Sequence, residues 1–162
     1  MAIGHLQRKR YTKVYERVAT RLRAKDFGGA RAIIENARGL GAMHAASLSA
    51  SVYEAMGRRR DAERILRTAA RRAPHDVRPL RELVELYRDG GSGQRARRLL
   101  DKLWARARGG RFKESRRTVY EWLVELEASF GPEASIRHCA EALMMYPQSP
   151  AIRAWLRDVL CS

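Results

Sequence analysis

The sequence predicts an all-α fold, an α-solenoid of about four antiparallel helix pairs followed by a C-terminal capping helix. Three observations lead to this prediction. Apolar residues recur at helical spacing through most of the 162-residue chain. A group of residue types repeats at an offset of 34 positions. Glycine and proline gather in the short segments between the helical stretches, where turns are expected.

The 34-residue period joins residues 45–74 to residues 77–107. The pairs of residues separated by this offset are Tyr53 and Tyr87, Gly57 and Gly91, Ala62 and Ala96, and Leu66 and Leu100. A period of this length is typical of stacked helix pairs, in which each repeat is one helix, a short turn and a second helix. We expect the glycine to form the turn, the alanine to allow close helix contact, and Pro74 to stop the second helix.

This pattern resembles the tetratricopeptide-repeat family. The resemblance is strongest over the two central repeats and implies a right-handed stack whose concave side binds partners. Pentatricopeptide-like and half-a-tetratricopeptide repeats share the same scaffold, and residues 116–127 also fit the latter. They remain alternatives within one architecture. Paired lysine and asparagine residues, which clamp a C-terminal carboxylate in some members of the family, are not found, which disfavours binding of that kind.

The outer repeats are predicted from their apolar faces. In the first pair, the first helix is expected from Tyr11 to Lys25. A turn over residues 26–29 and a second helix that contains Ala30 and Ile34 are expected to follow. The fourth pair is expected at residues 115–130 and 133–146, and a lone amphipathic helix at residues 150–160 would cap the array. The domain prediction is therefore a basic N-terminal arm at residues 1–10 and a single helical-repeat domain at residues 11–162.

The chain is strongly basic. It carries 33 lysine and arginine residues against 18 acidic residues, a formal net charge of +15. A chain of this charge is attracted to polyanions such as RNA, DNA or an anionic membrane surface. Arginine dominates, and it forms the better bidentate contacts with phosphate. A genome rich in G and C also favours arginine over lysine, but it does not explain the excess of positive charge.

The basic residues form stripes at helical spacing, which we expect to contact phosphates. Arg60, Arg64, Arg67 and Arg71 share one face of a predicted helix, and no carboxylate is expected inside this face. The full set of predicted RNA- or polyanion-binding residues is Arg10, Lys13, Arg17, Arg21, Arg60, Arg64, Arg67, Arg71, Arg95, Arg98, Arg111 and Lys113. A solvated surface would be the plainer interpretation, although such surfaces usually mix the two signs of charge.

The first helices of the repeats supply a second predicted site, a groove that binds a peptide or a partner helix. The predicted protein-binding residues are His44, Ser51, Arg78, Arg81, Glu85, Arg88, Tyr120 and Glu127. This mixture of charged, polar and aromatic side chains is less basic than the stripes. It favours protein partners over nucleic acid at this surface.

The sequence shows no recognisable set of catalytic residues. The glycine-rich segment at residues 89–93 lacks the lysine and serine or threonine of a phosphate-binding loop, so we interpret it as a turn. His138 and Cys139 are adjacent in one helix and point in different directions, which disfavours a metal site. The three tryptophans are flanked by apolar residues and are predicted to be core. We therefore expect no enzyme activity, no cofactor and no metal.

The sequence favours a non-catalytic scaffold that binds RNA and neighbouring proteins in a ribonucleoprotein assembly, with a mitochondrial ribosome as the most economical setting. The alternatives are a protein–protein adaptor without nucleic-acid contact and a peripheral subunit of a membrane-associated complex. A mitochondrial matrix or cytoplasmic location is expected, because no apolar core of a secretory signal is found. No small-molecule substrate and no transmembrane segment are expected.

Overall fold

The computed structural model describes the backbone of residues 2–160 and the side chains of residues 11–131, 136 and 138–157. Within this part of the chain the structure consists of α-helices joined by turns and short loops. The helices are α1 (Ala2–Arg23), α2 (Phe27–Glu35), α3 (Ala42–Ala55), α4 (Arg59–Arg72), α5 (Arg78–Asp89), α6 (Gly93–Arg108), α7 (Arg116–Ala128), α8 (Pro132–Met145) and α9 (Pro150–Leu160).

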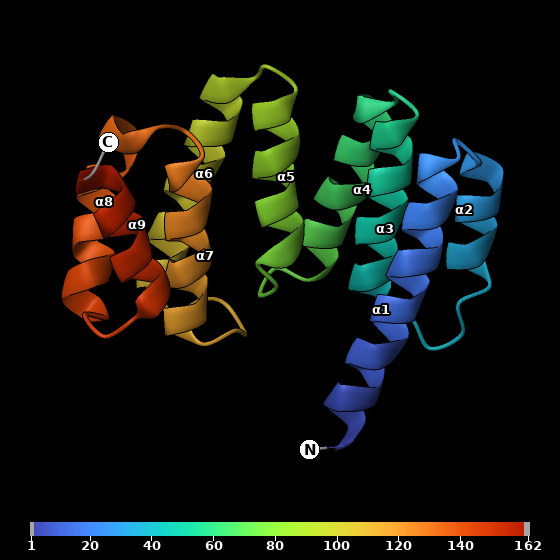
Figure 1. Cartoon of the computed structure of the whole chain (residues 1–162), viewed down its shortest axis with the longest axis horizontal. Helices are drawn as coiled ribbons and strands as arrows, with labels where there is room; N and C mark the ends of the chain where they lie inside the picture. The colour runs from blue at the N-terminus through green and yellow to red at the C-terminus, as the bar shows by residue number, and fades with distance from the viewer. Residues whose placement is uncertain (1, 161–162) are drawn as a thin grey trace. The chain divides into compact units, whose positions relative to one another are not determined.

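The helices form two compact units, Met1–Arg72 and Ala73–Ser162. In the first unit α1 packs against α2, and α3 packs against α4 (Figure 1). In the second unit α5 packs against α6 and α7 against α8, while α9 contacts both α7 and α8. The predicted fold of antiparallel helix pairs with a terminal helix is confirmed. The assignment of residues 11–162 to a single domain stays a prediction.

The two central turns have the same backbone geometry at the repeat offset. Gly57 and Gly91 adopt φ angles of 73° and 72°, in the left-handed region. The amide after each glycine donates to the carbonyl of the repeat tyrosine, over 2.8 Å from Arg58 to Tyr53 and 2.8 Å from Ser92 to Tyr87. This is the hydrogen bond that closes a helix with a left-handed residue. A side chain at either glycine would meet open space, so the positive φ angle is what requires glycine.

The first repeat closes the same turn with a different residue. Lys25 adopts a φ angle of 56°, and the amide of Asp26 donates to the carbonyl of Arg21 over 2.9 Å. The prediction of a turn over residues 26–29 is wrong, because α2 begins at Phe27. Asp26 caps this helix, and its Oδ1 accepts from the amide of Gly29 over 2.8 Å.

The first helix also begins earlier than expected. The sequence suggested a helix from Tyr11 after a basic arm, whereas α1 begins at Ala2. No proline interrupts residues 2–23, so the helix can extend toward the N-terminus beyond Tyr11, its predicted first residue. The final helix, by contrast, begins at Pro150 and ends at Leu160 as predicted.

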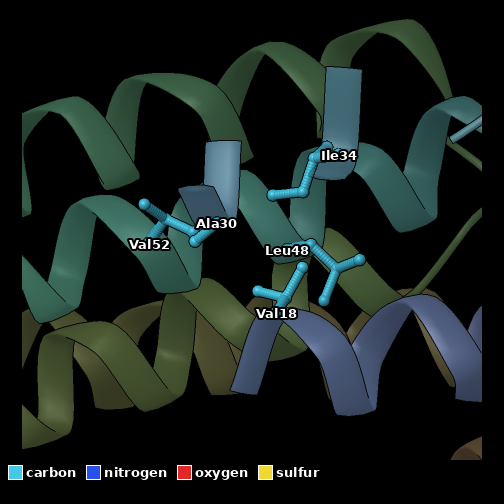
Figure 2. Close-up of a cluster of buried hydrophobic side chains, with 5 residues drawn as sticks. All are labelled: Val18, Ala30, Ile34, Leu48 and Val52. Carbon is cyan, nitrogen blue, oxygen red and sulfur yellow. The ribbon is translucent and has the colours of Figure 1, made fainter. Parts of the chain in front are cut away.

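One core cluster of the first unit lies between α1, α2 and α3. Its buried residues are Val18, Ala30, Ile34, Leu48 and Val52, which converge from the three helices (Figure 2). Ala30 and Val52 are fully buried. The small side chain of Ala30 lets α2 approach its neighbour closely, which is the role that the repeat pattern predicts for this position.

The core of the second unit is built around Trp104 of α6, which is fully buried. Its ring meets Tyr120 of α7 edge to face, with the centroids 5.1 Å apart. Trp155 of α9 is also buried, and Trp122 of α7 is half-buried. The prediction that tryptophans serve as core is confirmed for Trp104 and Trp155.

Candidate functional site

The basic face of α1 is partly available to a ligand. Lys13 and Arg17 are exposed one turn apart, and neither forms an ion pair with any described residue. Arg21 lies on the same face, and its Nη1 donates to Asp26 Oδ2 over 2.8 Å. The side chain of Arg10 lies outside the described residues. Two of the four predicted cations of this face are therefore both exposed and without a carboxylate partner among the described residues.

The face of α4 that was predicted to lack carboxylates contains two ion pairs. Arg64 lies 3.1 Å from Asp61, and Arg67 lies 2.9 Å from Glu63. Acidic residues three and four positions earlier reach two of the four arginines along the helix, and the role of this face in binding a polyanion stays a prediction. Exposed pairs of this kind contribute little to stability, so a phosphate can compete for the arginines.

The two ends of the α4 face remain basic. Arg60 is exposed and forms no ion pair with a described residue. Arg71 is exposed, and its Nη2 donates to the hydroxyl of Thr68 over 3.3 Å. At the start of this face, Arg60 therefore has no carboxylate partner among the described residues. Near its end, Arg71 donates to a neutral hydroxyl.

On α6 some arginines bind aromatic rings. The guanidinium of Arg95 lies 4.4 Å from the centroid of Tyr87, and that of Arg97 lies 5.8 Å from the centroid of Phe130. Both contacts are within the range of cation–π attraction. Arg98 and Lys102 are exposed and pair with no described carboxylate. Arginine is suited to stacking as well as to charge, which gives a structural reason for its use over lysine here.

The loop between α6 and α7 folds back onto the turn before α5. The amide of Lys113 donates to the carbonyl of His75 over 2.8 Å, and His75 Nδ1 lies 2.9 Å from the carbonyl oxygen of Arg111. Arg106 Nη2 donates to the carbonyl of Pro74, and its guanidinium lies 4.9 Å from the ring of Phe112. These contacts give the long connection between the third and fourth repeats a defined conformation.

A buried carboxylate holds this loop in place. Asp76 is 1% exposed and accepts hydrogen bonds from Arg78 Nε over 2.9 Å and from Lys113 Nζ. Burial acts to raise the pKa of Asp76, but the hydrogen bonds from Arg78 and Lys113 outweigh it and hold that pKa well below its ordinary value. Lys113, predicted to bind a polyanion, is thus engaged with Asp76, whereas Arg111 is exposed and forms no ion pair with a described residue.

Two residues of the predicted protein-binding groove are not on the surface. Tyr120 is 2% exposed and Glu127 is 4% exposed, so neither side chain can line an open groove. The correction follows from the apolar stripe of α7. Leu123 lies three positions after Tyr120 and four before Glu127, and this spacing places all three on one buried face. That spacing was visible in the sequence and could have identified Glu127 as a buried residue.

The other predicted groove residues are engaged with neighbours in their own unit. In the first unit His44 lies against Tyr11, with ring centroids 4.3 Å apart, and Ser51 donates to the carbonyl of Ser47. In the second unit Arg78 binds Asp76, and Arg81 Nε lies 3.1 Å from Glu85. Arg88 Nε lies 2.7 Å from Asp89. A protein-binding role for these residues stays a prediction.

A polar network inside the second unit was missed. His138 Nδ1 lies 2.7 Å from Glu127 Oε1, and the imidazole stacks on Trp104 with centroids 4.8 Å apart. Tyr120 donates to Glu141 over 3.2 Å, and Glu141 also accepts from Arg108 over 2.9 Å. This network joins α6, α7 and α8 within the second unit.

An apolar groove lies between α8 and α9. Its lining residues are Ile136, Cys139, Ala140, Leu143, Ile152, Trp155 and Leu156. Ile136 is 55% exposed, and Met144, which follows Leu143 on α8, is 81% exposed. Exposed apolar surface of this kind is typical of protein-binding sites.

Among the described residues, no three histidine, cysteine or acidic side chains come together as a metal site. No helix in the described part of the chain has the length and apolar character needed to span a membrane.

The comparisons with known proteins agree with the repeat geometry. A family model described as tetratricopeptide repeat matches residues 53–116, which run from the end of α3 to the start of α7. The resemblance drawn from residues 45–107 is thereby confirmed, and the match includes both turns closed by Gly57 and Gly91. No curated protein and no solved structure matches the chain.

Proposed function

We propose that this tetratricopeptide-like helical-repeat protein is a non-catalytic scaffold that binds RNA and neighbouring proteins in a ribonucleoprotein assembly. The repeat fold supports a role in binding protein partners. The RNA part of the proposal rests on the exposed cations that have no carboxylate partner among the described residues. These residues include Lys13, Arg17, Arg60, Arg98, Lys102, Arg111 and Arg116.

These cations carry the proposal because an internal role does not account for them. Structural arginines of this chain, such as Arg78 and Arg108, have carboxylate partners. Exposed cations at helical spacing repel one another weakly, and a polyanion would relieve that repulsion. A mitochondrial ribosome is one assembly in which so basic a scaffold would serve, and it stays our proposed setting.

Charge reversal tests RNA binding. Arg17→Glu combined with Arg60→Glu and Arg98→Glu changes three exposed residues and leaves the core intact. We expect weaker affinity for a fluorescent single-stranded RNA, measured by anisotropy, and a shallower dependence on salt. The logarithmic slope should fall by about 0.7 for each phosphate that the protein no longer neutralises. Unchanged affinity with the fold retained in circular dichroism would overturn the RNA proposal.

A second function, a protein–protein adaptor without RNA, is favoured by a different observation. The groove between α8 and α9, whose lining includes the exposed Ile136, is an apolar surface that RNA would not recognise. Substituting Ile136→Glu and Leu156→Glu should abolish capture of a protein partner from lysate if the adaptor function holds. Capture that persists in these variants but disappears after RNase treatment would contradict the adaptor and agree with the RNA proposal.

A further inference from the structure

Three arginine residues lie at the loop between α6 and α7. Arg106 comes from the last turn of α6, Arg111 from the loop itself and Arg116 from the first turn of α7. The Nε atom of Arg111 lies 3.5 Å from the position that a Cβ on Gly109 would occupy. Arg116 Nη2 lies 3.0 Å from the corresponding position on Gly110. Because adjacent Cα atoms are about 3.8 Å apart, two guanidinium groups flank one short piece of backbone.

The described carboxylates of this region form no ion pair with these arginines. Asp76 accepts from Arg78 and Lys113. Glu114 acts electrostatically on Arg78. Arg106 donates to a backbone carbonyl and lies against the ring of Phe112. Arg111 and Arg116 are exposed and form no ion pair with any described residue.

The electrostatic environment of Arg106 also favours an anion near this loop. Burial lowers the pKa of its guanidinium, and the nearby positive charge of Arg111 lowers it further. Two like charges held close together in a folded loop are unfavourable, and an anion between them would relieve their repulsion. The loop keeps this arrangement because Asp76 and the hydrogen bonds of His75 fix its conformation.

The two glycines keep the backbone open at this point. Gly110 adopts a φ angle of 64°, and a Cβ there would press against Arg116. A Cβ on Gly109 would contact Arg111 at its Nε. Because glycine has no Cβ, the guanidinium groups of Arg111 and Arg116 can lie against the backbone. Their remaining N–H groups then stay available to a ligand. Guanidinium groups that come from different elements and lie beside neighbouring residues of one loop suit a phosphate, which has several oxygens to accept from them.

We infer that Arg106, Arg111 and Arg116 form a binding site for backbone phosphates of single-stranded RNA at the loop between α6 and α7. This inference rests on the proposed function and adds to it a particular site. Arg111 and Arg116 supply the main phosphate contacts. Arg106 orients the loop through Pro74 and adds positive charge.

The test compares two double variants of equal net charge by fluorescence anisotropy with a labelled oligouridine. Arg111→Ala/Arg116→Ala removes the two main phosphate-binding side chains. The control, Arg38→Ala/Arg157→Ala, removes two exposed arginines that lie elsewhere in the chain and form no ion pair with a described residue. We expect the site variant to bind about tenfold more weakly at about 0.15 M salt, and its salt slope to fall by about 1.4, which corresponds to about 0.7 for each of two phosphates. The control should weaken binding by less than about threefold, because neither residue belongs to the loop between α6 and α7 or to the turns that border it.

The outcomes separate this site from the general proposal. If wild-type protein binds RNA and the two double variants weaken binding equally, the site is overturned while RNA binding stands. If wild-type protein does not bind, the proposed function fails as well. Inorganic phosphate, added at constant ionic strength, distinguishes the source of the phosphate. Complete displacement of the RNA by inorganic phosphate would assign the loop to free phosphate and overturn the inference.

Discussion

His138 Nδ1 lies 2.7 Å from Oε1 of Glu127, in the interior of the second unit. Glu127 is 4% exposed, and the imidazole stacks on the fully buried Trp104. This pair ties α8 to α7 through a hydrogen bond, and the stacking ties both helices to α6. The pair therefore links the stability of three helices to the ionisation of one buried acid.

The stability of the protein should depend on the ionisation of Glu127. Burial raises the pKa of Glu127, against the opposing hydrogen bond from His138, so the folded chain holds this proton more tightly than the unfolded chain. Protonated Glu127 makes its full contribution to the free energy of unfolding below the ordinary pKa of glutamate. This contribution is lost as the pH rises through the raised pKa of the folded chain. We expect wild-type protein to lose stability relative to Glu127→Gln between acidic and neutral pH.

Urea unfolding followed by tryptophan fluorescence at several pH values measures this difference. Glu125→Gln is the matched control, since Glu125 lies on the same helix and its side chain is 68% exposed. The control should unfold in parallel with wild-type protein across the range. Parallel curves for Glu127→Gln as well would show that the buried pair does not carry the expected pH dependence.

Asp76→Asn should loosen the loop between α6 and α7. The substitution removes the charge that accepts from Arg78 and Lys113, so we expect a loss of about 2–3 kcal/mol in the free energy of unfolding. Because the pKa of Asp76 is depressed, its contribution is present above the ordinary pKa of aspartate and is lost as the pH falls through the depressed value. Asp89→Asn, at a half-exposed carboxylate, should change stability by less than about 0.5 kcal/mol in the same urea titration.

Lys25→Gly should stabilise the first unit. Lys25 adopts a positive φ angle at the position that glycine occupies in the next two repeats, and such a conformation costs an L-residue about 1 kcal/mol. We expect a gain of roughly 0.5–1 kcal/mol, reduced by the greater freedom of glycine in the unfolded chain. Gly57→Ala is the reverse experiment and should destabilise by about 1 kcal/mol, because open space surrounds that position and only the φ angle opposes the change. A rise in the urea midpoint for Gly57→Ala would refute the role of the positive φ angle in these turns.

Leu48→Ala should weaken the first unit through a cavity between α1, α2 and α3. Leu48 is 2% exposed and packs with Val18 and Ile34, so we expect a loss of about 3 kcal/mol in the free energy of unfolding. Tyr15→Ala, at a side chain that is 52% exposed, should cost less than about 1 kcal/mol. Similar losses at the two positions in thermal unfolding would contradict the core in Figure 2.

The repeat was predictable because its residues act locally. Gly57 and Gly91 close turns through their own backbone angles, and Ala62 and Ala96 are buried at fixed distances along the chain from those turns. The candidate site was less predictable, because the effect of an arginine depends on its neighbours in space. Arg111 and Lys113 look alike in the sequence, yet the structure places a buried carboxylate beside Lys113 and pairs Arg111 with no described carboxylate.

The sequence by itself determined the helical class, the 34-residue period, the central turns and the large excess of positive charge. These follow from spacing along the chain, which local hydrogen bonds and apolar stripes translate directly into helices. Only the tertiary structure decided that Glu127 pairs with His138, that Asp76 anchors Lys113, and that Arg111 and Arg116 lie beside Gly109 and Gly110. Contacts between residues 11 to 37 positions apart depend on how helices pack, and no local pattern encodes them.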